Sequence, residues 1–539
     1  MKKTLLFLFA LLAGFSFKAR ATHDIGGSLT YACVAPGVYG FFYSHYNWSG
    51  LPAIPSNMNL MISSPGCSNT RVVPFYNLRP SRPGGYVPPT FGLTSYMITT
   101  MISTVVLTAT EAACGNVVVN VAIGNGQRAD NLSPTGGVGQ YTEAIINVSG
   151  NLSGLQNSSP EFDIRNEPVL VAARYQPITL SLAAHDPDGD SLVYRLVAPI
   201  TGHNQPITNY ATFTGPFVNP DPQAPFSNPG YPQVALLSGS SVYSANFPLL
   251  SYYANWASAQ PIIAAQKNFV LDPHSGSLSF TPMLYNTSSN NVYLVSFQID
   301  DYRKVNGIVT KLGSIRRETI IIVGDPAGNI NPKLTNIQTN IAANPANGVY
   351  TISAGTNFTL QALANDANAS DSVYLASNAS QEMPGANFTV SSGSQPTATF
   401  SWTPTATQVR NQPYYLRVWV KDNASPLAAK RVETFAIRVA NPGGLMAVKP
   451  GVEAVNFFAF PNPFTQEVSF KLPAQTQAGE IIIYNLLGQK IDHLKIVANA
   501  TNKADLRWFK AANYPAGTYL AKFVSGDKII QTVKFIKAQ

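Results

Sequence analysis

The chain has 539 residues, which is enough for three or four domains, and 45% of them are apolar. Only 12% are charged, whereas 39 are glycine and 40 are proline, which favours turn-rich extracellular β-modules and disfavours a helical enzyme. The net charge of +8 resides in the two ends of the chain, so residues 22–455 sum to −1 and a basic patch for a nucleic-acid partner is excluded.

The first 21 residues have the pattern of a secretory signal peptide. Lys2 and Lys3 form a basic start, Leu5–Phe17 an apolar segment, and Ala19-Arg20-Ala21 a cleavage site. The apolar segment is too short to span a membrane as a helix, and no other stretch has eighteen uninterrupted apolar residues. We therefore expect a mature protein that begins at residue 22 and has no transmembrane segment.

Residues 22–158 are predicted to form an N-terminal β-rich module. Aromatic and β-branched runs alternate there with Gly, Pro and Asn, and the longest β-favouring run is Met97–Leu107. The module holds the three cysteines of the chain, Cys33, Cys67 and Cys114. In an exported chain we expect one disulfide and one odd thiol, and all three pairings are open.

The start of this module resembles that of large surface proteins of the gliding-motility-associated kind from Bacteroidetes. The resemblance rests on Thr22-His23-Asp24-Ile25-Gly26-Gly27 followed by Thr30-Tyr31. Those relatives commonly carry Tyr-Arg-Asp-Cys further along, where this chain has Tyr46-Asn47-Trp48. The cross-link that the resemblance implies therefore lacks its cysteine at this position.

Two β-sandwich modules are predicted next, over residues 159–325 and 326–441. Both contain a strand, an Asp turn, a Phe and Thr-Pro segment and a strand that ends in Asp. The segments are Ile178–Ala184, Phe280–Pro282 and Tyr293–Asp301 in the first module, and Phe358–Ala364, Phe400–Pro404 and Leu416–Asp422 in the second. Two copies of one plan indicate a tandem array. The first copy resembles a cadherin-like or immunoglobulin-type extracellular repeat.

A Pro- and Asn-rich insertion, residues 202–266, interrupts the first sandwich and is long for a sandwich loop. It carries six large aromatic residues: Tyr210, Tyr231, Tyr243, Tyr252, Tyr253 and Trp256. Rigid aromatic rings suit a contact surface for a carbohydrate or a protein. They suit a small core beneath the loop equally well, and both interpretations stay open.

Three carboxylates spaced two residues apart are the strongest candidate metal ligands: Asp186, Asp188 and Asp190. Around the Pro187 and Gly189 turn they can direct oxygens at one hard cation such as calcium. The resemblance to cadherin-like repeats implies that role for Asp186 and Asp188, and by analogy adds Asp300. The alternative is a solvated turn held by hydrogen bonds from side chains to the backbone. At Asp366 and Asp371 of the next sandwich, the sparser pattern favours such a turn.

Sequence signatures of catalysis are missing. The chain has no G-x-S-x-G, H-E-x-x-H or P-loop motif. Its six histidines are scattered without metal-ligand spacing: His23, His45, His185, His203, His274 and His493. We therefore expect that the protein is not an enzyme and that calcium is the one candidate cofactor.

After a linker, residues 442–455, the segment 456–539 carries turn formers between short β-favouring runs, which predicts a small antiparallel sandwich. Its order of PNP, apolar strand, Y-x-L-x-G, P-x-G-x-Y and basic end resembles the type A C-terminal sorting domain of the type IX secretion system. The motif residues are Pro461, Asn462, Pro463, Tyr484, Gly488, Gly517, Tyr519 and Lys537. The resemblance implies export across the outer membrane by the type IX machinery. It also implies removal of this domain and attachment to surface lipopolysaccharide.

The expected fold class is all-β, with tandem β-sandwich modules and a small C-terminal β-sandwich sorting domain. The expected function is that of a secreted or cell-surface protein in adhesion or in contact with a matrix or a glycan, and its partner is an unknown surface protein or glycan. The alternative is a structural or accessory component of gliding motility or of a surface layer. A secreted enzyme of uncharacterised activity is the third hypothesis.

Overall fold

A computed structural model describes most of the chain. The described residues are 24–49, 58–67, 69–78, 81–90, 93–123, 129–132, 139–149, 152, 155–163, 165–166, 168–214, 240–253, 266–287, 289–425, 427–441, 458–460, 462, 464–472, 479–485, 489–496, 506–525 and 528–537. The predicted signal peptide and the predicted linker, residues 442–455, lie outside them. The chain divides into two compact units, Met1–Ala440 and Asn441–Gln539.

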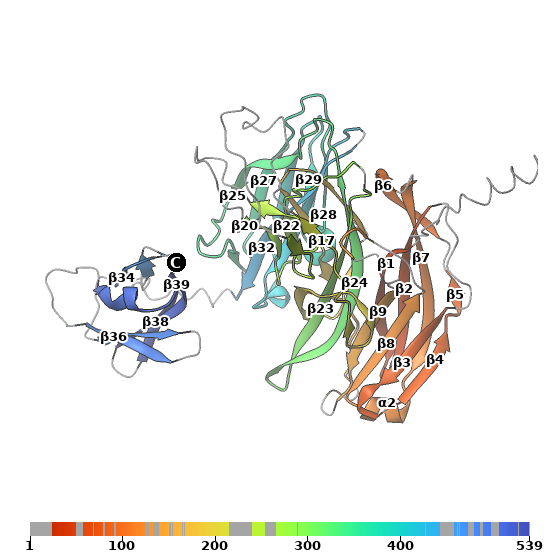
Figure 1. Cartoon of the computed structure of the whole chain (residues 1–539), viewed down its shortest axis with the longest axis horizontal. Coiled ribbons are helices and arrows are strands. Elements are labelled where there is room, and N and C mark those ends of the chain that lie inside the picture. Colours follow the sequence, from red (N-terminus) through yellow and green to blue (C-terminus); the bar gives the residue numbers. More distant parts are fainter. Residues whose placement is uncertain are drawn as a thin grey trace, which may run out of the picture. The chain divides into compact units, whose positions relative to one another are not determined.

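The first unit is built on a 13-stranded sheet, whose strands between residues 24 and 147 are the red and orange strands of Figure 1. Hydrogen-bonded neighbours follow the order β4-β3-β8-β9-β24-β1-β2-β7-β5; in addition, β6 pairs with β7, β11 and β23 pair with β24, and β14 pairs with β23. The strands are β1 (Asp24–Ala35), β2 (Val38–Trp48), β3 (Asn59–Ser64), β4 (Asn69–Pro74), β5 (Asn77–Leu78), β6 (Arg82–Thr90), β7 (Leu93–Val106), β8 (Asn116–Ile123), β9 (Gln140–Asn147), β11 (Val169–Ala173), β14 (Ser191–Leu196), β23 (Val292–Val305) and β24 (Ile308–Gly324).

One disulfide closes the end of the N-terminal module. It joins Cys67 of the short 3-10 helix η1 (Pro65–Cys67) to Cys114, which follows the helix α2 (Ala109–Ala113). Cys33 remains a half-buried free thiol. Of the three pairings that the sequence left open, the fold selects Cys67–Cys114, because only it brings two cysteines from neighbouring segments together.

The hairpin β23–β24 corrects the predicted separation of modules at residues 158 and 159. Its strands have 14 and 17 residues, far more than the usual five or six. One part of β24 therefore pairs with β9 and β1, while its last residues pair with β11. The core is continuous across the predicted boundary, and Leu29 and Phe41 belong to the same buried cluster as Leu180 and Phe280.

The sandwiches that follow share one pairing plan, in agreement with the predicted repeat. β12 (Ile178–Ser181) pairs with β22 (Ser277–Phe280) as β27 (Phe358–Asn365) pairs with β30 (Thr397–Trp402). β14 pairs with β23 as β28 (Tyr374–Ser377) pairs with β31 (Tyr414–Lys421). β11 runs parallel to β24 as β26 (Tyr350–Ser353) runs parallel to β32 (Lys430–Ala440). The strands β21 (Phe269–Leu271), β25 (Lys333–Thr339) and β29 (Asn387–Val390) complete the two modules.

Alternation of apolar and polar residues places the core of the later sandwich between its two sheets. Along β27 and β30, every second side chain is buried, including Phe358 and Trp402. They face Leu416 and Val418 of β31 across the sandwich. The short helix α3 (Ala379–Glu382) and the 3-10 helix η3 (Ala406–Gln408) occupy the connections. The described chain has only two short α-helices, so the predicted all-β class is confirmed.

The described part of the 202–266 insertion contributes to the core. Tyr243 is buried, with its ring centroid 4.7 Å from that of Phe213 and 6.0 Å from that of Tyr293, and Tyr210 packs partly buried against the same cluster. Tyr231 and Trp256 lie outside the described residues. Tyr252 and Tyr253 form β19, and nothing is described of their side chains. The described rings therefore favour the core interpretation over the contact surface.

Several two-stranded sheets complete this region of the first unit. They pair β10 (Glu161–Phe162) with β13 (Ala184–His185), β15 (Ile200–Gly202) with β16 (Gln205–Pro206), β17 (Thr212–Thr214) with β18 (Ser240–Val242), and β19 (Tyr252–Tyr253) with β20 (Gln266–Lys267).

The second unit is a small antiparallel sandwich, as the turn pattern predicted. One sheet has the order β33-β34-β37 and the other β36-β35-β38-β39. The elements are β33 (Phe458–Phe460), β34 (Val468–Lys471), β35 (Gly479–Asn485), β36 (Lys490–Ile496), β37 (Leu506–Trp508), the 3-10 helix η4 (Phe509–Asn513), β38 (Gly517–Ser525) and β39 (Lys528–Lys537). Phe470 and Trp508 from the first sheet pack against Phe535 from the second and close the core.

Candidate functional site

The structure brings Asp186, Asp188 and Asp190 together, with one oxygen of each within 4.8 Å of the others. The buried Asp186 holds the turn, because its Oδ1 accepts the backbone N–H groups of Asp188 at 3.0 Å and of Asp190 at 2.9 Å. Burial, together with the neighbouring carboxylates, raises the pKa of Asp186 to about 7. Its Oδ2 is buried without a hydrogen-bond partner.

Arg303 supplies the counter-charge for this turn. Its Nε and Nη2 donate to the two carboxylate oxygens of Asp190 at 2.5 and 2.8 Å, and Nη2 lies 3.6 Å from Asp188. The Oδ2 of Asp188 also accepts the N–H of Ser158 at 2.6 Å. Calcium needs six to eight oxygen ligands. Since the oxygens of Asp190 are committed to Arg303, the fit to calcium is poor. The hydrogen bonds from Asp186 to the backbone match the alternative turn, but Asp186 is buried and not solvated.

Asp300 is placed away from this turn, which corrects the expectation from cadherin-like repeats. Adjacent residues of a strand point to opposite faces of the sheet. Asp300 points to Arg195 and Lys311, at 2.9 and 2.6 Å. Asp301 points the other way, and its Oδ2 accepts the Asn157 amide at 2.6 Å. Burial, together with the charge of Asp190, raises the pKa of Asp301 to about 6.

A second acidic cluster has the stronger fit to a cation. Asp366, Asp371 and Asp422 have oxygens within 4.8 Å of one another. Asp366 and Asp422 are almost fully buried, and burial raises the pKa of both. Among the residues that the structure describes, no Lys or Arg pairs with these three carboxylates, and Asp366 Oδ2 has no hydrogen-bond partner. Asn329 reaches the cluster from the connection between the sandwiches, donating its Nδ2 to Asp422 Oδ2 at 2.8 Å.

Sequence reasoning missed Asp422 and Asn329. The signal for Asp422 was present, because it ends a strand at the place where Tyr293–Asp301 ends in the preceding module. Nothing in the sequence marks Asn329, which a turn at Ala327 and Gly328, both with positive φ, carries to Asp422. The structure therefore moves the better cation candidate from Asp186–Asp190 to the later sandwich.

Polar contacts fix the two sandwiches side by side. The guanidinium carbon of Arg165 lies 4.6 Å from the Trp419 ring centroid. Arg417 donates to the carbonyl of Ser275 at 3.0 Å, and the hydroxyls of Ser277 and Thr434 are 3.0 Å apart. Because these contacts come from several strands, we infer that the pair of sandwiches is held in one arrangement.

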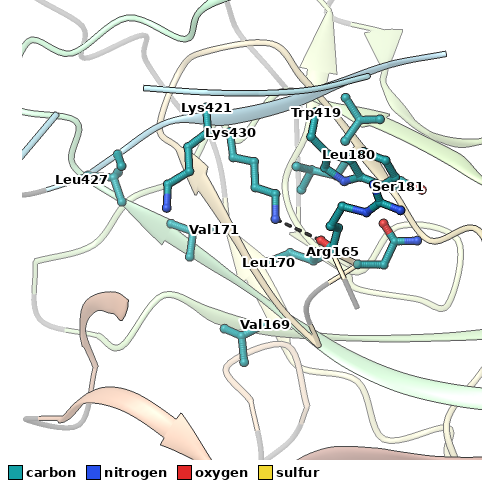
Figure 2. Close-up of a pocket in the computed structure, with 13 residues that line it drawn as sticks. Arg165, Val169, Leu170, Val171, Leu180, Ser181, Trp419, Lys421, Leu427 and Lys430 are labelled. Carbon is teal, nitrogen blue, oxygen red and sulfur yellow. Dashed lines mark hydrogen bonds between the residues drawn. The ribbon is translucent and has the colours of Figure 1, made fainter. Parts of the chain in front are cut away.

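A small cavity of about 120 Å³ lies at this joint, lined from β11, β12, β31 and β32. Figure 2 shows Lys421 and Lys430, which are cross-strand partners, extending toward it above Val171. Lys430 Nζ donates to the carbonyl of Arg165 at 3.1 Å. Small-molecule sites usually enclose roughly 300–1,000 Å³. The volume is too small for such a ligand, and the lysine contact ties the sandwiches together.

Two histidines meet carboxylates. His203 Nδ1 lies 2.9 Å from Glu143 Oε2, and His185 Nδ1 lies 3.1 Å from Glu382 Oε2 across the joint between the sandwiches. The hydrogen bond to Glu382 raises the pKa of His185. His45 is buried in the N-terminal module, His274 lies in the Asp272 turn, and His493 lies in the second unit. The described histidines therefore remain apart, as the sequence predicted, and do not form one site. His23 lies outside the described residues.

The described motif residues of the second unit hold its edges together. Asn462 accepts the N–H of Ile536 at 2.9 Å and donates to the carbonyl of Lys534 at 3.3 Å. The Tyr519 hydroxyl donates to the carbonyl of Pro515 at 2.5 Å. Lys537 Nζ donates to the carbonyl of Ala511 at 2.9 Å and to those of Ala512 and Tyr514, at the end of η4 where a cation is favoured.

The remaining motif residues are less informative. The ring of Tyr484 lies beneath Lys522 Nζ at 4.8 Å, and Gly517 begins β38. Pro461, Pro463 and Gly488 lie outside the described residues. In the described part, the motif is thus a set of contacts that close a sandwich and contains no catalytic arrangement.

Comparison with known proteins identifies this second unit. Residues 459–538 match the family model described as a secretion system C-terminal sorting domain. Curated protein sequences give no match to the chain. No helix among the described residues is long and apolar enough to cross a membrane.

Solved structures similar to the chain include arrays of Ig domains and of cadherin domains. The N-terminal eight Ig domains of Down Syndrome Cell Adhesion Molecule match at 9% identity and a TM-score of 0.17, over 96% of this chain and 49% of that one. The extracellular cadherin domains 1–5 of Protocadherin Gamma B2 match at 10% identity and a TM-score of 0.15, over 93% and 85%. This chain thus spans about half the length of the first of them. Such TM-scores are too low to add to the topology already given by the strand pairing.

The family match, the motif order and the sandwich fold agree on one assignment. Residues 459–538 are the C-terminal sorting domain of a protein that the type IX secretion system exports to the cell surface or the medium.

Proposed function

We propose that the exported body of the protein, residues 22–441, is an adhesin that contacts a matrix, a glycan or another surface protein and is not an enzyme. The observation that carries the proposal is the fixed packing of the two sandwiches, where Arg165, Arg417 and Ser277 make contacts across the joint. A rigid array presents its surfaces in one orientation, and many copies on one cell bind through multivalency. The signal peptide and the attachment to lipopolysaccharide belong to the same proposal.

The alternative is an accessory component of gliding motility or of a surface layer, whose partner is another envelope protein. A glycan array probed with the full chain distinguishes the two roles. Selective binding of sugars supports the adhesin. Capture of one envelope protein from cell extracts, together with a blank array, supports the accessory role and overturns the glycan-binding form of the adhesin.

Calcium is the cofactor that we propose for this array. Asp366, Asp371 and Asp422 would hold it, and Asn329 would link it to the connection between the sandwiches. A bound divalent cation would offset the repulsion among three carboxylates that have no described basic partner. The supporting observation is the unpaired Oδ2 of the buried Asp366. Melting of the full chain with calcium and with a chelator tests the proposal, and identical melting temperatures would overturn it.

A further inference from the structure

A larger cavity, of about 380 Å³, lies on the N-terminal module. Its floor is formed by β1, β2 and β7, and Glu161, Phe162, Asp163, Asn166 and Pro168 cover it from the start of the next module. The volume falls within the usual range of roughly 300–1,000 Å³ for small-molecule sites.

Hydroxyl groups line the floor for a reason that the strands make clear. Alternate residues of a strand point to opposite faces. Leu29 and Tyr31 of β1 point into the main core, so Ser28 and Thr30 point into the cavity. Ser44 of β2 is the cross-strand partner of Ser28 and lines the cavity too. The Ser28 hydroxyl lies 2.8 Å from that of Tyr46, and the Ser44 hydroxyl lies 3.1 Å from that of Thr100. A hydroxyl has one donor and two acceptor positions, so both serines keep hydrogen-bonding capacity for a ligand rich in such groups.

Arg317 gives the cavity a buried positive charge. It is 4% exposed, and its guanidinium carbon lies 4.2 Å from the Phe162 ring centroid and 5.6 Å from that of Tyr46. Its Nη2 donates to the carbonyl of Asn166 at 3.1 Å, but its Nε has no hydrogen-bond partner. Within the described part of the chain, no carboxylate forms an ion pair with it. Aromatic faces offset only part of the cost of burying such a charge.

The other charges around the cavity leave this cation unbalanced. Arg165 donates to both oxygens of Asp163, at 2.7 and 2.5 Å, and so neutralises that carboxylate. Glu161 and Arg82 are exposed at the rim, where water screens them. Asn166, which is 6% exposed, contributes an Oδ1 without a partner. The buried part of the cavity therefore offers a cation, a free acceptor and hydroxyl groups.

We propose that this cavity binds a glycan residue that carries a carboxylate, a sugar of the uronic-acid type. The carboxylate pairs with the guanidinium of Arg317, whose planar fork matches it. The ring hydroxyls bond to Ser28, Thr30 and Ser44, and the apolar face of the sugar packs on the aromatic rings. The inference rests on the proposed adhesive role and names the ligand class for it.

Titration calorimetry of the full chain with glucuronate and with glucose tests the proposal, because the two sugars differ only at C6, which is a carboxylate in glucuronate and a hydroxymethyl group in glucose. We expect glucuronate to bind at least roughly tenfold more tightly. Arg317→Gln should weaken glucuronate binding by roughly 10- to 100-fold and leave glucose binding unchanged. Lys304→Gln, at an exposed lysine outside the cavity, is the matched control and should bind like the wild type.

Equal binding of the two sugars, or wild-type binding by R317Q, would overturn the proposal. If R317Q does not fold, Ser44→Ala replaces it, since it removes a cavity hydroxyl at little cost to packing. S44A must then weaken glucuronate binding, and unchanged binding would overturn the proposal. The same proteins on the glycan array distinguish failure of the cavity proposal from failure of the proposed adhesive function. Binding of other glycans by R317Q at the wild-type level leaves the adhesin standing, even where the cavity has no role.

Discussion

Asp186→Asn is expected to stabilise the protein at pH 8 in the presence of a chelator. The pKa of this buried carboxyl is raised from 3.8 to about 7. The folded state therefore holds the proton more tightly than the unfolded state, and stability from this group falls as the pH rises from about 4 to 7. One pKa unit corresponds to about 1.4 kcal/mol, so the penalty at pH 8 is about 4 kcal/mol at most.

Asparagine removes this penalty and keeps the turn. Its Oδ1 can still accept the N–H groups of Asp188 and Asp190. Part of the raised pKa comes from the charges of the neighbouring carboxylates, so we expect the free energy of unfolding to increase by about 2–4 kcal/mol, at or below the maximum. This increase raises the melting temperature of a module of this size by roughly 5–10 °C. Differential scanning calorimetry of the full chain at pH 4.5 and pH 8 measures it. At pH 4.5 the gain should shrink to roughly 1 kcal/mol, because the carboxyl is protonated in the folded protein but mostly ionised in the unfolded chain.

Asp188→Asn is the matched control, because Asp188 lies in the same turn but is exposed. It should change stability by less than about 0.5 kcal/mol. A loss of stability in D186N at pH 8 with chelator, or an equal gain at both pH values, would refute the reasoning. Added calcium provides a further test. If calcium raises the melting temperature of the wild type but not of D186N, the result supports a calcium site at Asp186–Asp190 and contradicts the interpretation as a simple turn.

Three further predictions concern other sites. Glu382→Gln should flatten the change in melting temperature between about pH 5.5 and 8. The raised pKa of His185 gives stability that is fully present below its ordinary pKa of 6.5 and is lost as the pH rises through the higher pKa of the folded state; unchanged pH dependence would contradict this. Asp366→Asn should abolish the stabilisation by calcium, which is about 2.7 kcal/mol at a concentration 100 times the Kd, and a calcium response that survives in calorimetry would remove this site. Lys537→Ala should cost the sorting domain about 1–3 kcal/mol, since it frees three carbonyls, and should retain a reporter fused to residues 456–539 in the periplasm; wild-type surface labelling would show that the contact is dispensable.

The Asp186 turn shows how far sequence spacing reaches. A spacing of two residues around a Pro-Gly turn was enough to predict that three carboxylates converge, because that geometry is local. The partners of the turn are not local. Arg303 follows Asp190 by more than a hundred residues, and only the pairing of β14 with β23 brings them together. Arg303 nevertheless provides the main argument against a metal ion at this turn.

Register explains the error at Asp300. The sequence placed a strand ending in Asp300 and Asp301 near the turn, but a shift of one residue along a strand reverses the face. The observed register sets Asp301 beside Asn157 and Asp300 beside Lys311. A single sequence does not fix that parity, since both residues are buried and acidic.

By itself, the sequence determined what depends on short segments: the strands, through alternation of apolar residues, the repeat of one plan in two sandwiches, and the sorting domain, through the order of motifs between Pro461 and Lys537. Tertiary structure alone decided the pairing of Cys67 with Cys114, the joining of the first two modules by the long hairpin β23–β24, and the packing of Arg317 against the Phe162 ring. Each of these joins segments far apart along the chain, and their proximity follows from packing and strand register, which local residue preferences do not encode.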